Sequence, residues 1–236
     1  MFHIGEDRVA LVTDTSCDLS EEQLRQYDIR TVSLRVATSQ GEFRDRLEIG
    51  QEELYELLKK ELPKTSLPLP EDVTALYRDL REEGCTRILH LTLSASLSGT
   101  YNMVRLMAED CAPMRIDVVD TKTLSCGLGL LVLEAAEALK AGSPVEDVIA
   151  RVERLRKTQL GAFVIRTLEF LRKGGRIGLV EGVVGSLLQI KPVIYVNSDG
   201  VYNTLVKARG FSNALNAMTE EFVRRFEGRK VRIAIV

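Results

Sequence analysis

The sequence predicts an α/β fold, with an N-terminal, mostly parallel sheet flanked by helices and a smaller α+β unit after it. Two observations carry this prediction. Short apolar strands alternate with helical patterns up to residue 157, and beyond it two strand-like runs are joined by a tight turn. Alternation of this kind is typical of parallel sheets that are covered on both faces. With 236 residues the chain has the length for two modest domains, which we expect at 1–157 and 158–236.

The N-terminal unit has clear local signals for its elements. The expected strands are 9–13, 29–36, 87–93 and 115–120, and the expected helices are 20–27, 51–62, 71–83, 102–110, 127–141 and 143–159. Ser20 and Gln23 have the spacing of a capping box. Ser143 is expected to cap a helix whose first residue is Pro144. The connector 63–72 contains three prolines and cannot be a regular helix.

The C-terminal unit is expected to contain strands 160–165, 191–196 and 201–207 and a short helix at 167–175. Asp199-Gly200 stands between the last two strands and predicts a hairpin, which is antiparallel. The apolar run 231–236 is expected to be a further strand. Since a domain seldom ends on such a strand, we expect that the chain is truncated.

Composition excludes several classes of function. The formal net charge is −2, which argues against a nucleic-acid or membrane-surface binder. The longest apolar stretch is interrupted by Glu134 and is too short to span a bilayer, so no stable membrane insertion is expected. Four dispersed cysteines indicate reduced thiols, and two histidines exclude a histidine-rich metal site. We therefore expect a cytoplasmic protein with no metal and no cofactor.

Three of the expected strands end in polar clusters, at 13–18, 92–100 and 118–125. Ligands of open α/β sheets bind beyond the carboxyl ends of the strands. The clusters therefore predict a site to which Asp14, Thr15, Asp120 and Thr121 contribute polar loops. The alternative is that such residues only cap the helices that follow.

The serines after the third strand raise the question of catalysis. A nucleophilic serine needs a base, and the nearby His90 lies inside an apolar strand, where a hydrogen-bonded core residue is expected. A second possibility is a metal-dependent phosphotransferase or hydrolase centred on Asp14, with further carboxylates as Mg²⁺ ligands. Hydroxyls and free N–H groups at a helix start favour a third interpretation, an anion site.

The ordered set of motifs resembles the DegV family of fatty-acid-binding proteins. The motifs are "VTDTSCDLS", "KTSLP", "LTLSASLSGTYN", "VVDTKTLSCGLG", "TLEFLRKGGRIG", "LLQIKPVI" and "DGV", and they run through nearly the whole chain. The resemblance implies two domains with a tunnel for an acyl chain between them. It also implies that the protein is no enzyme, but a lipid-binding carrier that presents a long-chain fatty acid to a bacterial fatty acid kinase for acyl phosphate formation.

The resemblance also implies roles for particular residues. Hydroxyls and amides of two loops are expected to hold the fatty-acid carboxylate, and two arginines are expected to dock the kinase. The carboxylate set is Thr65, Ser66, Ser94, Ser98 and Gly99, and the docking residues are Arg176 and Arg209. The chain departs from the family pattern at Leu67, Leu69 and Ala95, where the family usually has polar residues.

The physics of burial favours a carrier. Each buried CH₂ contributes about 0.8 kcal/mol, so a sixteen-carbon chain gives roughly 12 kcal/mol before the costs of association. The apolar tail can therefore supply the affinity, and the hydroxyls orient the carboxylate. The tunnel lining is expected from apolar residues of 126–139, 161–171 and 178–194, in which Gly182 and Gly185 leave room beside a helix.

Overall fold

A computed structural model describes residues 1–178, 180 and 190–236 of the chain. The N-terminal unit contains β1 (Phe2–Ile4), β2 (Asp7–Asp14), the short 3₁₀ helix η1 (Thr15–Cys17), α1 (Glu21–Gln26), β3 (Ile29–Val32), β4 (Arg35–Thr38), β5 (Gly41–Arg44), α2 (Gln51–Leu58), β6 (Lys64–Ser66), α3 (Pro70–Glu82), β7 (Arg87–Thr92), α4 (Thr100–Glu109), β8 (Arg115–Asp120), α5 (Ser125–Lys140) and α6 (Val145–Arg156). The C-terminal unit contains β9 (Ala162–Phe163), α7 (Glu169–Lys173), β10 (Ile190–Val196), β11 (Tyr202–Arg209) and α8 (Phe211–Phe226).

The main sheet has the strand order β1-β2-β7-β8, and β3 also pairs with β2. The pairs β2–β3, β2–β7 and β7–β8 are parallel, and only the short β1 is antiparallel to β2. The expected mostly parallel sheet is therefore confirmed. The β1–β2 hairpin was not expected, because three residues before a Gly5 turn carry too little pattern to be read as a strand.

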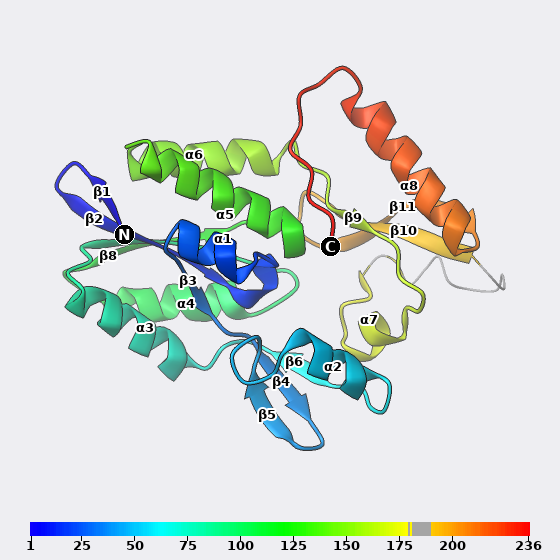
Figure 1. Ribbon diagram of the computed structural model, residues 1–236, viewed down its shortest axis with the longest axis horizontal. Coiled ribbons are helices and arrows are strands. Elements are labelled where there is room, and N and C mark those ends of the chain that lie inside the picture. Colours follow the sequence, from blue (N-terminus) through cyan, green and yellow to red (C-terminus); the bar gives the residue numbers. More distant parts are fainter. Residues whose placement is uncertain (179, 181–189) are drawn as a thin grey trace.

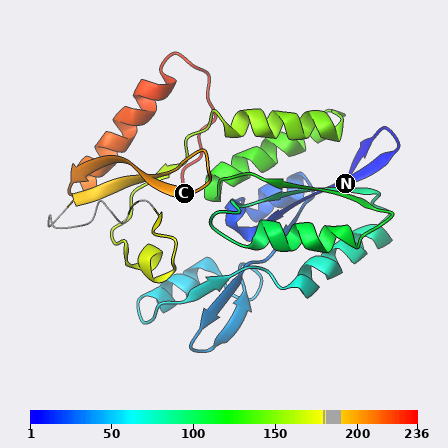
Figure 2. The same ribbon diagram turned by 180° about the vertical axis from the view of Figure 1, so that it is seen from behind.

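Helices cover both faces of this sheet, with α5 and α6 on one face and α3 and α4 on the other (Figures 1 and 2). Alternate residues of β2 define the two faces. Val9 and Leu11 pack in a cluster with residues of α5 and α6, whereas Ala10 and Val12 pack with residues of α3 and α4. Period-two alternation along a strand buried on both faces produces such a double core.

The expected strand 29–36 is in fact two strands that belong to different sheets. β3 ends at Val32 in the main sheet, and β4 begins at Arg35 in a small antiparallel sheet of order β5-β4-β6. The third strand of that small sheet, β6, lies in the proline-rich connector. An alternating pattern indicates which side chains are buried. It does not indicate with which strand the segment pairs, because the pairing partner can lie far away in the sequence.

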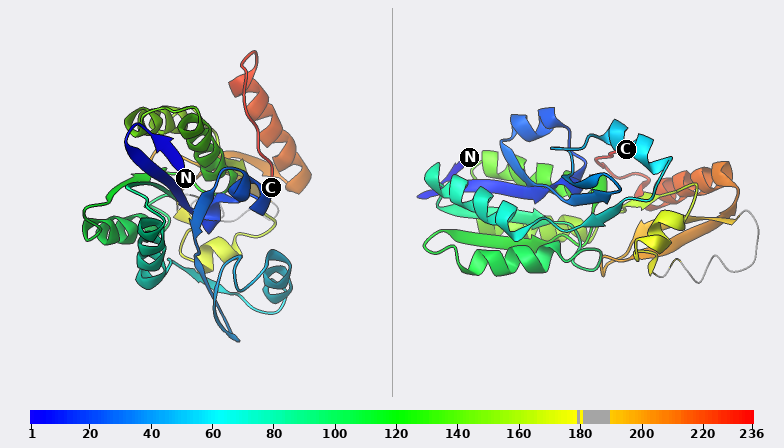
Figure 3. Two further views of the ribbon diagram at one scale, coloured as in Figure 1. Left: turned by 60° about the vertical axis from the view of Figure 1, so that its left-hand side comes forward. Right: turned by 90° about the horizontal axis from the view of Figure 1, so that it is seen from below.

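The C-terminal unit lies beside the main sheet along the long axis of the molecule (Figure 3). Its antiparallel sheet has the order β11-β10-β9, and β10 and β11 form the hairpin expected around Asp199-Gly200. The boundary expected at residue 157 falls between α6 and β9. Within the described parts of the chain, none of the helices has both the length and the apolar character needed to cross a bilayer.

Two local predictions were wrong. The run 231–236 is not a strand: it has no regular structure, and Ile235 is 90% exposed. It lies along α5, where the backbone carbonyl of Ala234 accepts a weak hydrogen bond from the Cys126 thiol at 3.8 Å. The start of α6 is shifted by one residue, since Pro144 is the N-cap and Val145 is the first helical residue. The capping box of Ser20 and Gln23 is confirmed.

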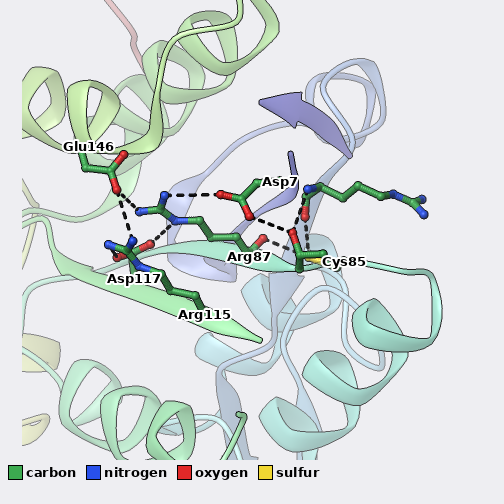
Figure 4. A network of polar contacts seen from close by, with 8 residues as sticks. Asp7, Cys85, Arg87, Arg115, Asp117 and Glu146 are labelled. Atoms are coloured by element: carbon green, nitrogen blue, oxygen red, sulfur yellow. Dashed lines mark hydrogen bonds and ion pairs between the residues drawn. The ribbon is translucent and has the colours of Figure 1, made fainter. Parts of the chain in front are cut away.

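A buried arginine closes the amino-terminal edge of the main sheet (Figure 4). The Arg87 side chain donates to Asp117 on β8 at 2.7 Å and to Glu146 in the first turn of α6 at 2.8 Å. Asp7 of β2 lies 3.7 Å away. This network ties three strands, β2, β7 and β8, to helix α6 at the edge opposite to the polar strand ends.

Candidate functional site at the β7–α4 turn

The carboxyl ends of β2, β7 and β8 meet at one edge of the main sheet. Thr92 at the end of β7 lies opposite Asp120 at the end of β8. Asp14 Oδ2 accepts a hydrogen bond from the backbone N–H of Leu93 at 2.8 Å, and Asp120 Oδ1 accepts one from the N–H of Ala95 at 3.1 Å. The two carboxylates therefore hold residues 93–99, the β7–α4 turn, from both sides.

Asp14 is fully buried, and both of its oxygens accept hydrogen bonds. Oδ1 accepts from the backbone N–H of Ser16 at 3.1 Å and from its hydroxyl at 2.5 Å, while Oδ2 accepts from Leu93. Burial raises the pKa of the Asp14 carboxyl to about 6, although the bonds from Ser16 and Leu93 oppose the shift. This geometry makes Asp14 an anchor of the turn.

The neighbouring acids do not complete a metal site around Asp14. Asp18 pairs with Arg46 at 2.5 Å and accepts a hydrogen bond from the Ser125 hydroxyl at 2.6 Å. Among residues 1–178, 180 and 190–236, no group of three or more His, Cys, Asp or Glu side chains could hold a metal ion. The geometry therefore gives the phosphotransferase alternative no support at Asp14.

The two threonines that follow these acids are structural ties. Thr15 Oγ1 accepts a hydrogen bond from the backbone N–H of Leu34 at 3.1 Å, and Thr121 Oγ1 donates to the carbonyl of Thr92 at 2.8 Å. Both threonines are buried. They fix the loops that surround the β7–α4 turn.

The serines of the turn contact the C-terminal unit. Ser94 is fully buried, and its hydroxyl donates to the carbonyl of Gly200 at 2.8 Å while it accepts from the N–H of Ser96 at 3.2 Å. The Ser96 hydroxyl donates to the carbonyl of Asp199 at 2.9 Å. A hydroxyl has one proton to donate, so Ser94 can bond a ligand carboxylate only by exchanging its bond to Gly200. Its predicted role toward a ligand stays a prediction.

Sequence reasoning missed the counterpart of these serines, Gly200. This residue has a φ of +79°, and a Cβ placed on it would lie 2.1 Å from Ser94 Oγ and 3.1 Å from Lys122 Cα. Only glycine fits such a position without displacing its neighbours. The Asp199-Gly200 pair predicts only a hairpin turn, because the residue that Gly200 contacts lies 106 residues earlier in the chain.

Ser98 and Gly99 form the start of α4. The Ser98 hydroxyl lies 2.8 Å from the Thr100 hydroxyl and accepts from the Thr100 N–H at 3.3 Å. Gly99 is exposed and is the N-cap of α4, where the first N–H groups have no partners within the helix. The start of the helix therefore offers donors at the surface of the turn.

Thr65 and Ser66 precede Leu67, whose side chain lies next to this helix start. A Cβ placed on Gly99 would lie 3.7 Å from Leu67 Cδ2, so the loop after β6 touches the turn. Thr65 and Ser66 are exposed on β6, and the Ser66 hydroxyl donates to Glu42 Oε1 at 3.3 Å. The structure thus places the loop that carries Thr65 and Ser66 against the β7–α4 turn, and the cooperation of their hydroxyls stays a prediction.

The two arginines predicted to dock a partner differ in their surroundings. Arg176 is half-buried, and its Nε donates to the carbonyl of Leu97 at 3.1 Å, so it holds the β7–α4 turn. Arg209 is exposed at the end of β11, opposite Ile190.

His90 is a core residue, as expected. It is fully buried, with Nδ1 2.7 Å from the Tyr77 hydroxyl, and burial lowers its pKa to about 3. A histidine in this position does not reach the serines of the turn as a general base, because it lies inside β7 and its ring bonds α3.

An apolar cluster of the C-terminal unit packs against the same turn. It is built around the buried Val180, Ile194 and Tyr202, and it includes Leu97 of the turn and Leu124 before α5. Its partly buried members from 161–171 are residues predicted to line a tunnel: Phe163, Ile165, Leu168 and Leu171.

The other predicted lining segments have different positions. The apolar residues of α5, such as Leu128 and Val132, pack in the core of the main sheet. Gly182 and Gly185 lie outside the described residues, as does most of 178–194.

Fold and site together define a class, a two-part α/β protein in which a hydroxyl-rich turn at a helix start lies between a parallel sheet and a smaller antiparallel unit. The family model of the DegV family, described as uncharacterised proteins, matches residues 8–236. A DegV domain-containing protein of Clostridium perfringens is 35% identical over 229 residues, which are 97% of this chain and 82% of that relative. The chain belongs to the DegV family.

Solved structures that are similar to this chain include proteins described as binding fatty acids. A fatty-acid-binding DegV family protein from Thermus thermophilus has a TM-score of 0.87 and 38% identity, covering 94% of this chain and 79% of that one. A stearic-acid-binding protein from Eubacterium ventriosum has a TM-score of 0.86 and 28% identity, with coverage of 93% and 77%. DegV of Bacillus subtilis, also described as fatty-acid-binding, has a TM-score of 0.83 and 29% identity, with coverage of 93% and 78%.

Proposed function

We propose that this chain binds a long-chain fatty acid between its two units and presents the carboxylate to a fatty acid kinase, with no catalysis of its own. The observation that carries the proposal is the contact between the two hydroxyl loops, next to an apolar cluster. Gly99 and Leu67 mark that contact, and Leu97 joins the turn to the cluster. The fatty acids bound by the solved relatives support the same ligand class.

The carboxylate would be held by hydroxyls and backbone N–H groups, without a fixed counter-charge. Thr65 and Ser66 are exposed on one side, and Ser98 with the N–H of Gly99 lies on the other. Ser94 joins this set when its hydroxyl donates to the ligand carboxylate in place of the Gly200 carbonyl. Burial of a carboxylate without such donors would be strongly disfavoured, so an apolar tunnel alone would not bind a fatty acid.

Thr65→Ala tests the head-group site. A hydrogen bond to a charged group contributes about 1.5–3 kcal/mol, so the Kd for a long-chain fatty acid should rise by about 10- to 100-fold. The matched control is Thr74→Ala, an exposed threonine on α3 whose hydroxyl bonds only within its own segment and to a methionine sulfur. Calorimetric titration of the delipidated chain gives both constants, and organic extraction with mass spectrometry identifies the lipid bound after expression.

Two results would contradict the proposal. One is a purified chain that carries no fatty acid and binds none in titration. The other is an equal effect of Thr65→Ala and Thr74→Ala, which would remove the threonine loop from the site.

Arg209 is proposed as a kinase-docking residue because it is an exposed cation at the end of β11. Arg209→Glu should weaken binding of the loaded chain to a fatty acid kinase by at least tenfold and leave fatty-acid affinity unchanged. Pull-down and lipid titration measure the two quantities separately. Unaltered kinase binding would place the docking surface elsewhere.

A further inference from the structure

A cationic pocket lies at the seam between the two units, and its lining includes Asn197 and Ser198 of the β10–β11 hairpin. The cavity has a volume of about 140 Å³. Its walls come from the β8–α5 loop, the end of α6, the linker that follows, the end of β10 with the hairpin turn, and α8. They are formed by Lys122, Thr123, Arg156, Lys157, Gln159, Leu160, Gly161, Tyr195, Val196, Asn197, Ser198 and Arg225.

Four of these side chains are cations and none is an acid. Elsewhere on the protein, arginines and lysines commonly pair with carboxylates, yet between described residues no ion pair involves Lys122, Arg156 or Lys157. Arg225 has Glu221 as an electrostatic neighbour on α8, but Glu221 forms its ion pair with Arg224 at 2.5 Å. The pocket therefore has a positive charge that the described part of the chain leaves uncompensated.

One donor in the pocket is buried without a partner. Arg156 Nε is shielded from solvent and has no hydrogen bond to any described residue. A buried donor left unsatisfied costs about 1–3 kcal/mol, and an acceptor placed in the cavity would remove that cost. Asn197 adds a second donor, because its carbonyl oxygen already accepts from the N–H groups of Asp199 and Val201 and its amide NH₂ remains to donate.

The helix macrodipole explains only part of this arrangement. Cations in the last turn of α6 interact favourably with its carboxyl end, which accounts for Arg154 as well as Arg156. It does not account for Lys122, which comes from the loop after β8, or for Arg225, which comes from α8. Convergence of cations from three elements on one cavity is the arrangement that binds a compact anion.

We propose that this seam pocket binds a phosphate group, either as free phosphate or as a phosphate monoester. A tetrahedral dianion fits a cavity of this volume and accepts from several donors at once, and arginine is especially suited to phosphate. The bound group would link α6 and the linker of one unit to the hairpin and α8 of the other. This site is separate from the proposed fatty-acid site and does not depend on it.

Titration of the full chain with sodium phosphate tests the proposal, with sodium chloride at matched ionic strength as the reference. Phosphate should bind at one site and raise the unfolding temperature in a saturable way. Arg156→Gln and Arg225→Gln should each raise the Kd for phosphate at least tenfold. Arg154→Gln is the matched control, since it removes a cation from the same turn of α6 but outside the pocket, and it should change the Kd less than twofold.

A parallel titration with methyl phosphate distinguishes the two sources of the phosphate group. Binding at least as tight as that of phosphate would assign the pocket to a phosphoryl group carried by an organic molecule. Binding more than tenfold weaker would assign it to free phosphate. The proposal is overturned if phosphate acts no differently from chloride, or if Arg154→Gln weakens binding as much as Arg156→Gln.

Discussion

Gly200→Ala perturbs the contact between the two units at the hydrogen bond from Ser94 to Gly200. The new Cβ would lie 2.1 Å from Ser94 Oγ, and its backbone would keep a φ of +79° that L-residues disfavour. The clash breaks the bond from the Ser94 hydroxyl to the Gly200 carbonyl, and that hydroxyl is fully buried.

The magnitude follows from two contributions. A left-handed backbone costs an alanine about 1–2 kcal/mol. Loss of the buried hydrogen bond adds about 1–2 kcal/mol, because the hydroxyl is left without its acceptor. The sum is roughly 3 kcal/mol, which for a chain of this length lowers the unfolding temperature by about 6–12 °C.

Gly142→Ala is the matched control, and calorimetry is the assay. Gly142 also has a positive φ, +84°, but a Cβ placed on it meets no atom within 4 Å. It reports the backbone contribution alone, so Gly200→Ala should be more destabilising by about 1–2 kcal/mol. In a Ser94→Ala background the difference should shrink, since the clashing oxygen is gone. Equal destabilisation by Gly200→Ala and Gly142→Ala would refute the reasoning.

Two further predictions concern buried charge. Arg87→Met should lower the free energy of unfolding by about 2–4 kcal/mol, because it leaves the largely buried Asp117 with only the exposed Arg115 as a partner. Arg115→Met removes a cation that pairs with the same acids but is 59% exposed, so it should cost under about 1 kcal/mol. Chemical denaturation compares the two variants, and equal effects would contradict the network. The pKa of His90 is lowered from 6.5 to about 3, so this residue destabilises the fold as the pH falls below 6.5, by about 1.4 kcal/mol per pH unit. The pKa of Asp14 is raised from 3.8 to about 6, so this residue stabilises the fold as the pH falls from 6 to 3.8. Between pH 3.8 and 6 these two groups change the free energy of unfolding in opposite directions. His90→Phe should therefore make stability decrease more with rising pH than in the wild type, and Asp14→Asn should make it increase more. Urea titrations across this range measure the pH dependence, and no change in either variant would exclude these groups.

The features that could be predicted from the sequence are local or arise from parallel topology. The capping box of Ser20 and Gln23 and the hairpin at Asp199-Gly200 depend on residues close together in the chain. The meeting of Asp14 and Asp120 around one turn follows from the rule that neighbouring parallel strands end at one edge.

The features that could not be predicted depend on long-range partners. The Ser94 hydroxyl donates to a carbonyl 106 residues away in the other unit, a partner that no local pattern indicates, while its role toward a ligand stays a prediction. The run 231–236 is apolar enough for a strand, but a strand exists only where another one pairs with it, and this segment lies along a helix instead.

The short passage from β3 to β4 determines where the proposed head-group threonine can be. Val32 is still paired in the main sheet and Arg35 is already paired in the small one, so only Ser33 and Leu34 lie between the two sheets. Leu34 between them is fastened on one side by Thr15. This short connection restricts how the small sheet can move relative to the main sheet. The position of Thr65 on β6 therefore depends on the main sheet. Inserting a single residue between β3 and β4 should reorient the whole small sheet. The Thr65 hydroxyl would then no longer reach the proposed carboxylate site, although both sheets stay folded.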